Sequence, residues 1–251
     1  MTVYFIGAGP GAADLITVRG QRLLQRCGVC LYAGSIMPDD LLQLCPAGAR
    51  IVDTGPLTLE QIVEELADAH AAGHDVARLH SGDPSLYSAV AEQCRRLDAL
   101  GIDYQIVPGV PAFAAAAAAL GRELTVPGVA QTVTLTRVAT LSTAMPDGED
   151  MAVLAAAGGT LVIHLAAHRI DAVVAELLDA GRSPDTPVAV VAFASWPREV
   201  VLRGTLADIA ARTHEAGVTR TAVIVVGDAL TTQGFSDSYL YSADRPRGRR
   251  H

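Results

Sequence analysis

Short runs of branched aliphatic residues alternate with helical stretches through the first half of the chain, and this alternation restricts the possible folds. We expect strands at four such runs: Val3–Ile6, Val29–Ala33, Asp75–His80 and Tyr104–Val107. Helices are expected near 18–27, 58–73, 85–100 and 112–120, the second of them with a capping box of Thr58 and Gln61. Apolar strands joined by helices form parallel sheets that are covered on both faces. The first half is therefore predicted to be an α/β domain with a largely parallel sheet.

From Glu123 onward the pattern changes to a mixture of hairpins and helices. Val188–Ala194 and Val200–Arg203 flank the turn Ser195–Arg198, which predicts an antiparallel pair. Further strands are expected at 131–137, 161–165 and 222–226, and further helices at 170–180 and 206–215. We therefore predict two α/β domains, residues 1–118 and 119–233, the second with a mixed sheet, followed by a tail at 234–251.

The composition argues against several classes of protein. Half of the residues are hydrophobic and 4% are aromatic, yet no apolar run approaches the roughly 18 residues of a membrane span. The first strand begins without a preceding signal sequence, so we expect a soluble protein of the cytoplasm. The formal charge of −8 argues against a general affinity for nucleic acid.

The four cysteines do not predict a metal or redox site. Cys27 and Cys30 have the spacing of such a pair, but Cys27 ends a helical pattern and Cys30 lies in an apolar run. Cys45 and Cys94 supply no second pair. Buried structural thiols are the favoured interpretation, and no metal is expected.

The sequence Ser81-Gly82-Asp83-Pro84 directly follows a predicted strand and precedes a predicted helix. Gly82 permits a ligand to approach the backbone, and Asp83 can accept hydrogen bonds from an amine or a sugar hydroxyl. Open α/β sheets bind ligands at the carboxyl ends of their strands, so this motif predicts a small-molecule site. An ordinary strand–turn–helix corner, with Asp83 as the N-cap and Pro84 in the first turn, is the alternative.

The loop Gly7–Ala12 resembles a dinucleotide fingerprint only superficially. That fingerprint requires a tight turn into a helix and a carboxylate at the end of the second strand. Here Pro10 and Asp14 lengthen the loop, and the second strand ends Tyr32-Ala33-Gly34. A nicotinamide or flavin site is therefore disfavoured, and a wall over a ligand cleft is favoured.

Four motifs in order resemble those of the tetrapyrrole methylase family: Gly7–Thr17, Tyr32–Ser35, Ser81–Pro84 and Pro108–Ala112. The resemblance covers roughly residues 1–230. It implies transfer of a methyl group from S-adenosylmethionine by a homodimer whose two α/β domains enclose a cleft, a fold distinct from the Rossmann-type methyltransferases. Tyr32–Ser35 followed by Ile36–Leu42 is most similar to the members that methylate precorrin-4 at C-11 in cobalamin biosynthesis.

The resemblance also implies a set of cofactor-binding residues, taken over position by position from the family motifs. These are Pro10, Ser81, Gly82, Asp83, Leu86, Pro111, Ala112, Leu165, Ala194, Thr221 and Ala222. For the members of the set in the second domain, an ordinary place in the core remains the alternative.

One departure from the family concerns Ala33. Uroporphyrinogen-III methylases carry an aspartate at this position, a candidate base, and no carboxylate replaces it nearby in this sequence. The departure counts against that neighbouring activity. Asp14 and Tyr87 remain candidate catalytic residues, each with a structural role as the alternative.

A precorrin carries many carboxylates, so an acidic protein that binds one needs local positive charge. Arg78 is the preferred candidate, with Arg19, Tyr32 and Ser35 as further substrate-binding residues. His80 and His164 lie inside apolar strands and are expected to be hydrogen-bonded residues of the core or wall.

Several related activities stay open at this point. Another precorrin, free of metal or cobalt-bound, or uroporphyrinogen III is an alternative substrate within the same family. More distant alternatives are a methylase of RNA or protein with this fold, and a protein that binds the cofactor without catalysis. The acidic charge disfavours an RNA substrate.

Overall fold

The chain folds into two compact α/β units. The computed structural model describes residues 1–34, 37–139 and 144–231, together with 235, 237–239, 242 and 245. The first unit comprises Met1–Ala115 with Phe193–Arg198, and the second comprises Ala116–Ala192 with Glu199–His251. The predicted domain boundary after residue 118 lies inside helix α5 (Ala112–Leu120), and most of the predicted tail lies outside the described residues.

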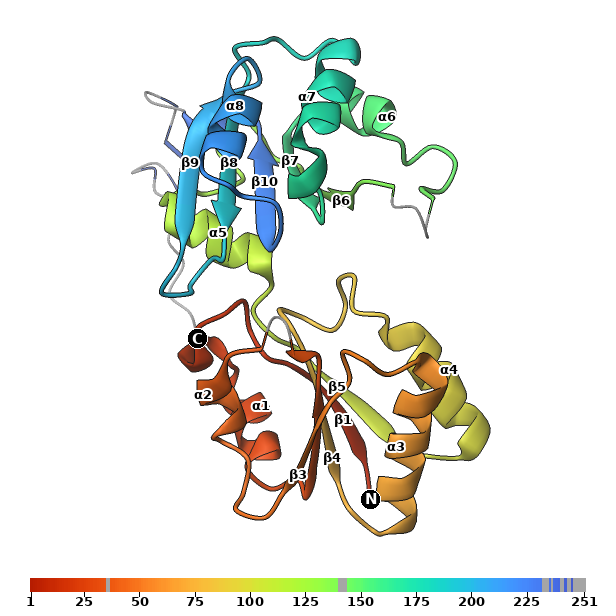
Figure 1. Ribbon diagram of the computed structural model, residues 1–251. Helices are drawn as coiled ribbons and strands as arrows, with labels where there is room; N and C mark the ends of the chain where they lie inside the picture. The colour runs from red at the N-terminus through yellow and green to blue at the C-terminus, as the bar shows by residue number, and fades with distance from the viewer. Residues whose placement is uncertain are drawn as a thin grey trace. The chain divides into compact units, whose positions relative to one another are not determined.

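The first unit contains a five-stranded sheet in the order β3-β2-β4-β1-β5 (Figure 1). Its strands are β1 (Val3–Gly7), β2 (Val29–Tyr32), β3 (Arg50–Asp53), β4 (Val76–His80) and β5 (Tyr104–Val107). Every pairing in this sheet is parallel, which confirms the prediction for the first half. Because the strands are parallel, the loops that follow β1, β4 and β5 meet at one edge of the sheet.

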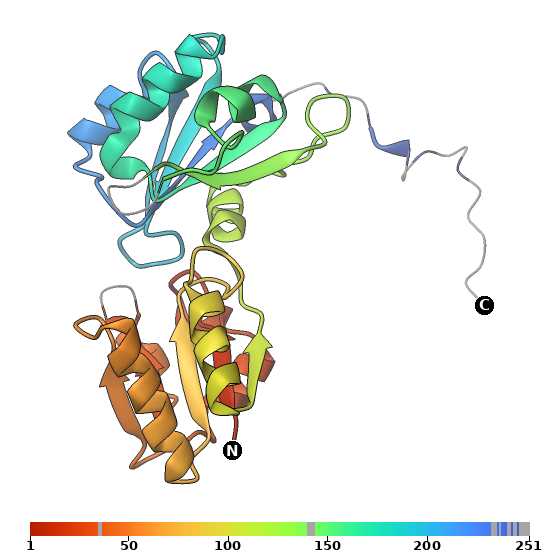
Figure 2. The ribbon, with the colours of Figure 1, turned by 90° about the vertical axis from the view of Figure 1, so that its right-hand side faces the viewer.

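Helices cover both faces of this sheet, as the buried strands require. Helices α1 (Val18–Leu24) and α2 (Asp39–Leu42) lie on one face, and α3 (Leu59–Ala71) and α4 (Val90–Leu100) lie on the other (Figure 1). Alternate residues of each strand enter the two cores, so Ile6 packs on the α1 face and Phe5 on the α3 face. In the turned view of Figure 2, α3 and α4 lie in front of the sheet.

Two helix starts test the local sequence rules. Thr58 and Gln61 form the predicted capping box of α3, with each side chain bonded to the other's backbone N–H. Helix α4 was expected from Ser85 but begins at Val90, so Pro84 does not lie in its first turn. Tyr87 and Ala89 adopt left-handed backbone angles, φ +53° and +50°, which interrupt helical geometry before Val90.

The second unit contains the mixed sheet that was predicted, in the order β6-β7-β10-β8-β9. Its strands are β6 (Val133–Arg137), β7 (Thr160–His164), β8 (Pro187–Ala192), β9 (Val200–Thr205) and β10 (Ala222–Val226). Only β6 and β7 pair in parallel, and β8 and β9 form the expected antiparallel pair. The helices of this unit are α6 (Met151–Ala156), α7 (Ile170–Asp179) and α8 (Ile209–Glu215).

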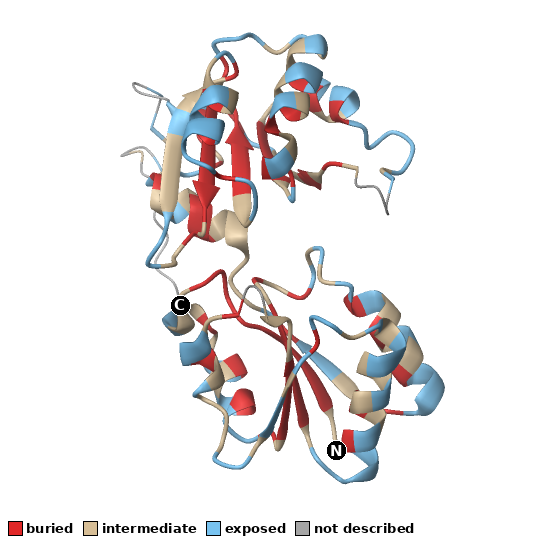
Figure 3. Ribbon diagram, viewed as in Figure 1, coloured by how far each residue is buried: buried red, intermediate tan, exposed pale blue. Residues whose placement is uncertain are grey.

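The core of each unit follows its central strands, which are drawn as buried in Figure 3. Cys27 and Cys30 are buried free thiols in the first core, and burial raises the pKa of Cys27 to about 12. The described residues contain no cluster of His, Cys, Asp or Glu fit to hold a metal ion. Nor does the described part of the chain include a helix of the length and apolarity needed to cross a membrane.

Candidate functional site

Three glycine-bearing loops pack against one another at the carboxyl edge of the first sheet. Gly7 ends β1, Gly82 follows β4, and Gly109 follows β5. A Cβ atom on Gly109 would lie 2.1 Å from the Gly82 carbonyl oxygen and 2.7 Å from the Gly7 Cα. Gly9 and Gly82 also exchange backbone hydrogen bonds, at 3.3 and 2.7 Å. The backbones approach so closely that only glycine fits, and the first loop is held in place by its neighbours.

Asp83 fastens two of these loops together. Its Oδ2 accepts a hydrogen bond from the Gly109 N–H at 2.7 Å, and its Oδ1 accepts one from the Ser85 N–H at 2.8 Å. Burial raises the pKa of this carboxyl, but the hydrogen bonds from Ser85 and Gly109 outweigh that effect and lower it below its ordinary value. Asp83 is therefore ionised at neutral pH, and it holds the loops instead of acting as the N-cap of α4.

The turn at 193–198, distant in sequence, packs on the loop after β1. Trp196 Nε1 donates to the Pro10 carbonyl at 3.1 Å, and the Ala12 N–H donates to Ser195 Oγ at 3.0 Å. A Cβ on Gly11 would lie 2.2 Å from the Trp196 ring. The predicted cofactor residues Pro10 and Ala194 thus lie in two segments that contact each other. Sequence reasoning missed this contact, although Trp196 is the one tryptophan of the chain.

The N-terminus of α5 lies beside Gly82. A Cβ on Gly82 would be 3.6 Å from the Ala112 nitrogen and 3.6 Å from the Pro111 Cα. The first N–H groups of a helix lack intrahelical acceptors and attract anionic groups such as a carboxylate. The structure therefore brings Gly82, Pro111 and Ala112, three of the predicted cofactor residues, together next to a natural anion-binding element.

Several non-glycine residues with left-handed backbone angles lie in or next to the segments that carry predicted cofactor residues. Among the described residues there are six such positions: Tyr87, Ala89, Leu165, Phe193, Ser195 and Thr221. Leu165 and Thr221 are themselves predicted cofactor residues, Phe193 and Ser195 flank Ala194, and Tyr87 follows Leu86. Strained backbone is retained mainly where function requires it. The six positions lie in or beside segments of each unit that carry predicted cofactor residues, whose roles stay predictions.

Two of these positions, Leu165 and Thr221, lie at the ends of adjoining strands in the second sheet. Leu165 directly follows β7, whose His164 pairs with Val223 of β10. Thr221 directly precedes β10, whose Ala222 pairs with Ala192 at the end of β8. Leu165 has φ +55° and is 55% exposed, so its side chain contributes little to the core. The alternative of an ordinary core residue is therefore wrong for Leu165.

The candidate catalytic and substrate residues of the first unit have different surroundings. Asp14 is exposed on the short 3-10 helix Ala13–Leu15, Arg19 is exposed on α1, and Tyr87 is 44% exposed. Tyr32 is partly buried at the end of β2, while Ser35 lies outside the described residues. Their roles as catalytic or substrate-binding residues stay predictions.

Arg78 is not the edge cation that was expected. It is 5% exposed, and it donates to Gln93 Oε1 at 3.1 Å and to Thr54 Oγ1 at 3.0 Å. Burial lowers the pKa of this guanidinium to about 10, so it remains a cation at neutral pH. The sequence around Arg78 is that of an apolar strand, and it did not predict the hydrogen bonds to Gln93 and Thr54.

His80 is also a buried polar residue of β4. Burial, with a smaller effect of the Arg78 charge, lowers the pKa of its imidazole to about 3, so the ring is neutral. The ring lies 5.8 Å from the Phe5 ring, and its Nε2 has no hydrogen-bond partner among the described residues. The expectation of a fully hydrogen-bonded His80 is therefore wrong at this atom.

A carboxylate does lie next to the loop that contains Ala33. Asp53, at the end of β3, accepts hydrogen bonds on Oδ1 from the Gly34 N–H at 2.9 Å and the Gly55 N–H at 2.8 Å. No carboxylate adjoins Ala33 in the sequence, but the pairing of β2 with β3 brings Asp53 beside Tyr32. The sequence did not predict that the Asp53 side chain holds this loop.

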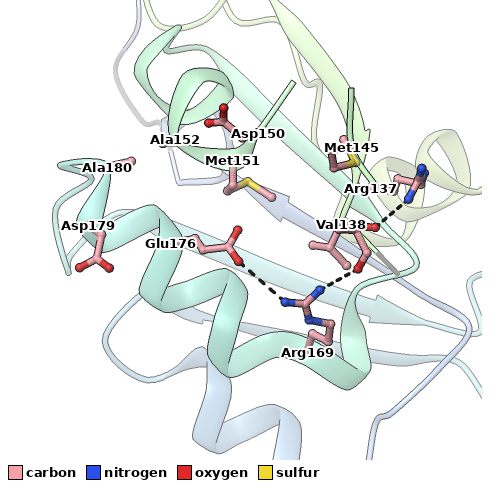
Figure 4. Close-up of a pocket in the computed structure, with 11 residues that line it drawn as sticks. Arg137, Val138, Met145, Asp150, Met151, Ala152, Arg169, Glu176, Asp179 and Ala180 are labelled. Carbon is pink, nitrogen blue, oxygen red and sulfur yellow. Dashed lines mark hydrogen bonds and ion pairs between the residues drawn. The ribbon is translucent and has the colours of Figure 1, made fainter. Parts of the chain in front are cut away.

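A separate cavity of about 450 Å³ lies in the second unit, beside β6, α6 and α7 (Figure 4). Arg169 Nη1 donates to the Ala139 carbonyl at 2.7 Å, and Arg137 donates to the Val138 and Ala144 carbonyls at 3.0 and 3.2 Å. Both arginines of the cavity therefore support the backbone after β6. None of the predicted catalytic or cofactor residues lines this cavity.

Comparisons with known proteins agree with this description. A family model described as Tetrapyrrole (Corrin/Porphyrin) Methylases matches residues 2–210. The chain is 80% identical over 245 residues to precorrin-4 C(11)-methyltransferase of Mycobacterium tuberculosis, covering 98% of each chain. A solved cobalt precorrin-4 methyltransferase, a cobalamin biosynthetic enzyme, has a TM-score of 0.89 and 41% identity, covering 92% of this chain and 96% of that one. A uroporphyrin-III C-methyltransferase of Thermus thermophilus, complexed with S-adenyl homocysteine, has a TM-score of 0.78 and 30% identity, covering 92% and 94%.

Proposed function

The chain belongs to the tetrapyrrole methylase family, and we propose that it transfers a methyl group from S-adenosylmethionine to C-11 of precorrin-4, giving precorrin-5 and S-adenosylhomocysteine. The observation that carries the proposal is the high similarity to a precorrin-4 C(11)-methyltransferase over almost the whole length of both chains. The similarity includes the loops that the structure brings together at the edge of the first sheet.

The residues present fit S-adenosylmethionine. The amino-acid end of the cofactor needs an anion-binding element and close backbone contact, and Gly82 beside the N-terminus of α5 offers both. Its apolar parts need uncharged surroundings, and Leu86, Leu165, Ala194 and Ala222 have side chains of that kind. We propose that these residues bind the cofactor together with Pro10, Ser81, Asp83, Pro111, Ala112 and Thr221.

The reaction makes modest demands on the protein. When bound, S-adenosylmethionine supplies an electrophilic methyl group. The task of the chain is then to hold both ligands in line and to exclude water, which fits a site built from rigid backbone. Asp83 and the three packed glycines hold that backbone. Asp14 and Tyr87 are the proposed groups for removing a proton from the ring.

The substrate is a polycarboxylate, and its binding requires donors and cations. We propose that Tyr32, Ser35 and Arg19 contact it directly. Arg78 has already used its Nε and Nη1 donors on protein atoms, so we propose that it acts indirectly. Ala33, where uroporphyrinogen-III methylases have an aspartate, favours a precorrin over uroporphyrinogen III.

We also propose that the chain acts as a homodimer in the cytoplasm, without a nucleic-acid or membrane partner. The homodimer is what the family resemblance implies, and the acidic charge disfavours a nucleic-acid partner. Light scattering of the purified protein checks the assembly, and a monomer at micromolar concentration would contradict it.

Mass spectrometry tests the proposed reaction. The purified protein is incubated with S-adenosylmethionine and one of three substrates: metal-free precorrin-4, cobalt-precorrin-4 or uroporphyrinogen III. A gain of one methyl on precorrin-4 alone supports the proposal, and NMR of the product identifies the carbon. Methylation of uroporphyrinogen III alone would contradict it, and methylation of only the cobalt-bound ring would revise the substrate.

A further inference from the structure

The buried polar side chains of the first unit gather around Arg78. Among the described residues of that unit, tyrosine apart, Thr54, Arg78, His80 and Gln93 are the polar or charged residues less than one-tenth exposed. Arg78 bonds two of them, and no carboxylate among the described residues pairs with it. A buried cation without a counter-charge is costly to desolvate, so the burial of Arg78 needs a structural or functional explanation.

On one side, Arg78 is connected to the loop after β2. Thr54 accepts from Arg78 Nη1 and donates from its own hydroxyl to the Tyr32 carbonyl at 3.0 Å. The Thr54 N–H also donates to that carbonyl, at 2.7 Å. The preceding residue, Asp53, holds the Gly34 N–H, so the last residue of β3 and the residue after it fix both ends of Tyr32–Gly34.

On the other side, Arg78 is connected to the segment before α4. Gln93 accepts from Arg78 Nε and donates from Nε2 to the Ala89 carbonyl at 2.8 Å. Ala89 has φ +50°, and Tyr87 close by has φ +53°. Left-handed backbone at such residues persists only where surrounding contacts hold it. The Gln93 bond is a contact of this kind, and Arg78 fixes the Gln93 side chain.

We propose that Arg78 is a positioning residue, which through Thr54 and Gln93 fixes the loop after β2 and the segment before α4 and so sets the affinity for the tetrapyrrole. This inference rests on the proposed function, because those segments carry Tyr32 and Tyr87, a proposed substrate residue and a proposed catalytic residue. The cofactor loops are fastened by different bonds, from Gly109 to Asp83 and between Gly9 and Gly82. The loop after β2, which Thr54 holds, can therefore be disrupted separately from the cofactor loops.

Three substitutions separate positioning from direct contact with a substrate carboxylate. Thr54→Ala breaks the connection while Arg78 keeps its charge, and Thr54→Ser keeps the hydroxyl as the matched control. Arg78→Lys keeps the charge but loses the fixed pair of donors. We expect Thr54→Ala and Arg78→Lys to raise the KM for precorrin-4 about tenfold or more. Thr54→Ser should stay near the wild-type KM, and the Kd for S-adenosylmethionine should change little in the two Thr54 variants.

Two results would overturn the proposal, one from the KM values and one from cofactor binding. One is a wild-type KM in Thr54→Ala with a raised KM in Arg78→Lys, which would indicate direct contact between the guanidinium and the substrate. The other is a Kd for S-adenosylmethionine that rises in Thr54→Ala as much as the KM does, which would indicate a general structural defect.

Hydrogen exchange tests the same network without any substrate. Thr54→Ala should speed amide exchange over 29–34 relative to Thr54→Ser, and equal exchange of this segment in the two variants would overturn the proposal. If the wild type fails to methylate precorrin-4, the proposed function fails, and the exchange measurement still decides whether Arg78 positions these segments.

Discussion

The Asp83 carboxylate accepts the backbone N–H of Gly109 at 2.7 Å and thereby joins the loop after β4 to the loop after β5. The bond spans 26 residues of sequence and lies beside the contact of Gly109 with the Gly82 carbonyl. Both loops carry residues proposed to bind the cofactor. The geometry of the cofactor loops therefore depends on one ionised side chain and on close packing of backbone.

Replacing Asp83 should weaken cofactor binding. Asp83→Ala leaves the Gly109 N–H without its acceptor, and we expect the binding free energy of S-adenosylmethionine to fall by about 1–3 kcal/mol. Isothermal titration calorimetry measures this change. Ser85→Ala is the matched control, because it removes the neighbouring hydroxyl but preserves the Gly109 bond, and it should bind nearly normally. Unchanged affinity in a folded Asp83→Ala variant would contradict the assigned role.

A side chain at Gly109 should be tolerated poorly. The Cβ of Gly109→Ala would meet backbone atoms of Gly82 and Gly7, which cannot rotate away, so we expect a loss of about 3 kcal/mol or more in the free energy of unfolding. Gly28→Ala is the control, since its Cβ would meet only the movable side chain of exposed His74 at 3.0 Å. Urea unfolding compares the two variants. Equal losses would show that the glycine packing is not tight.

Local patterns were sufficient to predict much of the fold. Periodicity and glycine placement predicted the parallel first sheet, the mixed second sheet and the capping box of Thr58, because each depends on residues close in sequence. The same patterns predict a ligand site at the end of β4. They failed at the start of α4, since the left-handed conformation of Tyr87 and Ala89 is imposed by contacts that no local rule contains.

The remaining features depend on partners distant in sequence. Arg78 bonds residues 24 and 15 positions away, and Trp196 bonds a carbonyl 186 positions away. Nothing in the neighbourhood of Arg78 shows that its charge is buried, so the expectation of an exposed arginine followed ordinary burial preferences. The carboxylate of Asp53 was missed for the same reason, because only strand pairing brings it beside Gly34.

Acid should destabilise the protein partly through His80. Burial, and then the Arg78 charge, lowers the folded-state pKa of His80 from 6.5 to about 3. The unfolded chain therefore binds the proton first, and stability that is present above pH 6.5 is lost as pH falls toward 3. Between pH 7 and pH 5 this loss amounts to about 2 kcal/mol. Urea unfolding at both pH values should show a smaller difference in His80→Gln, and an unchanged difference would contradict the assignment. His74→Gln, at an exposed position, is the control.

Leu165 should matter for binding and not for folding. It is 55% exposed with φ +55°, so Leu165→Gly relieves strain and should leave the free energy of unfolding unchanged or raise it by up to about 1 kcal/mol. The loss of its apolar contact should weaken binding of S-adenosylmethionine about tenfold. Leu100→Gly is the matched control, because Leu100 is 54% exposed at the end of α4, where glycine should cost about 1 kcal/mol. Thermal unfolding and calorimetry on both variants check the contrast. A Leu165→Gly variant that loses as much stability as the control, or that binds the cofactor normally, would refute the role of Leu165.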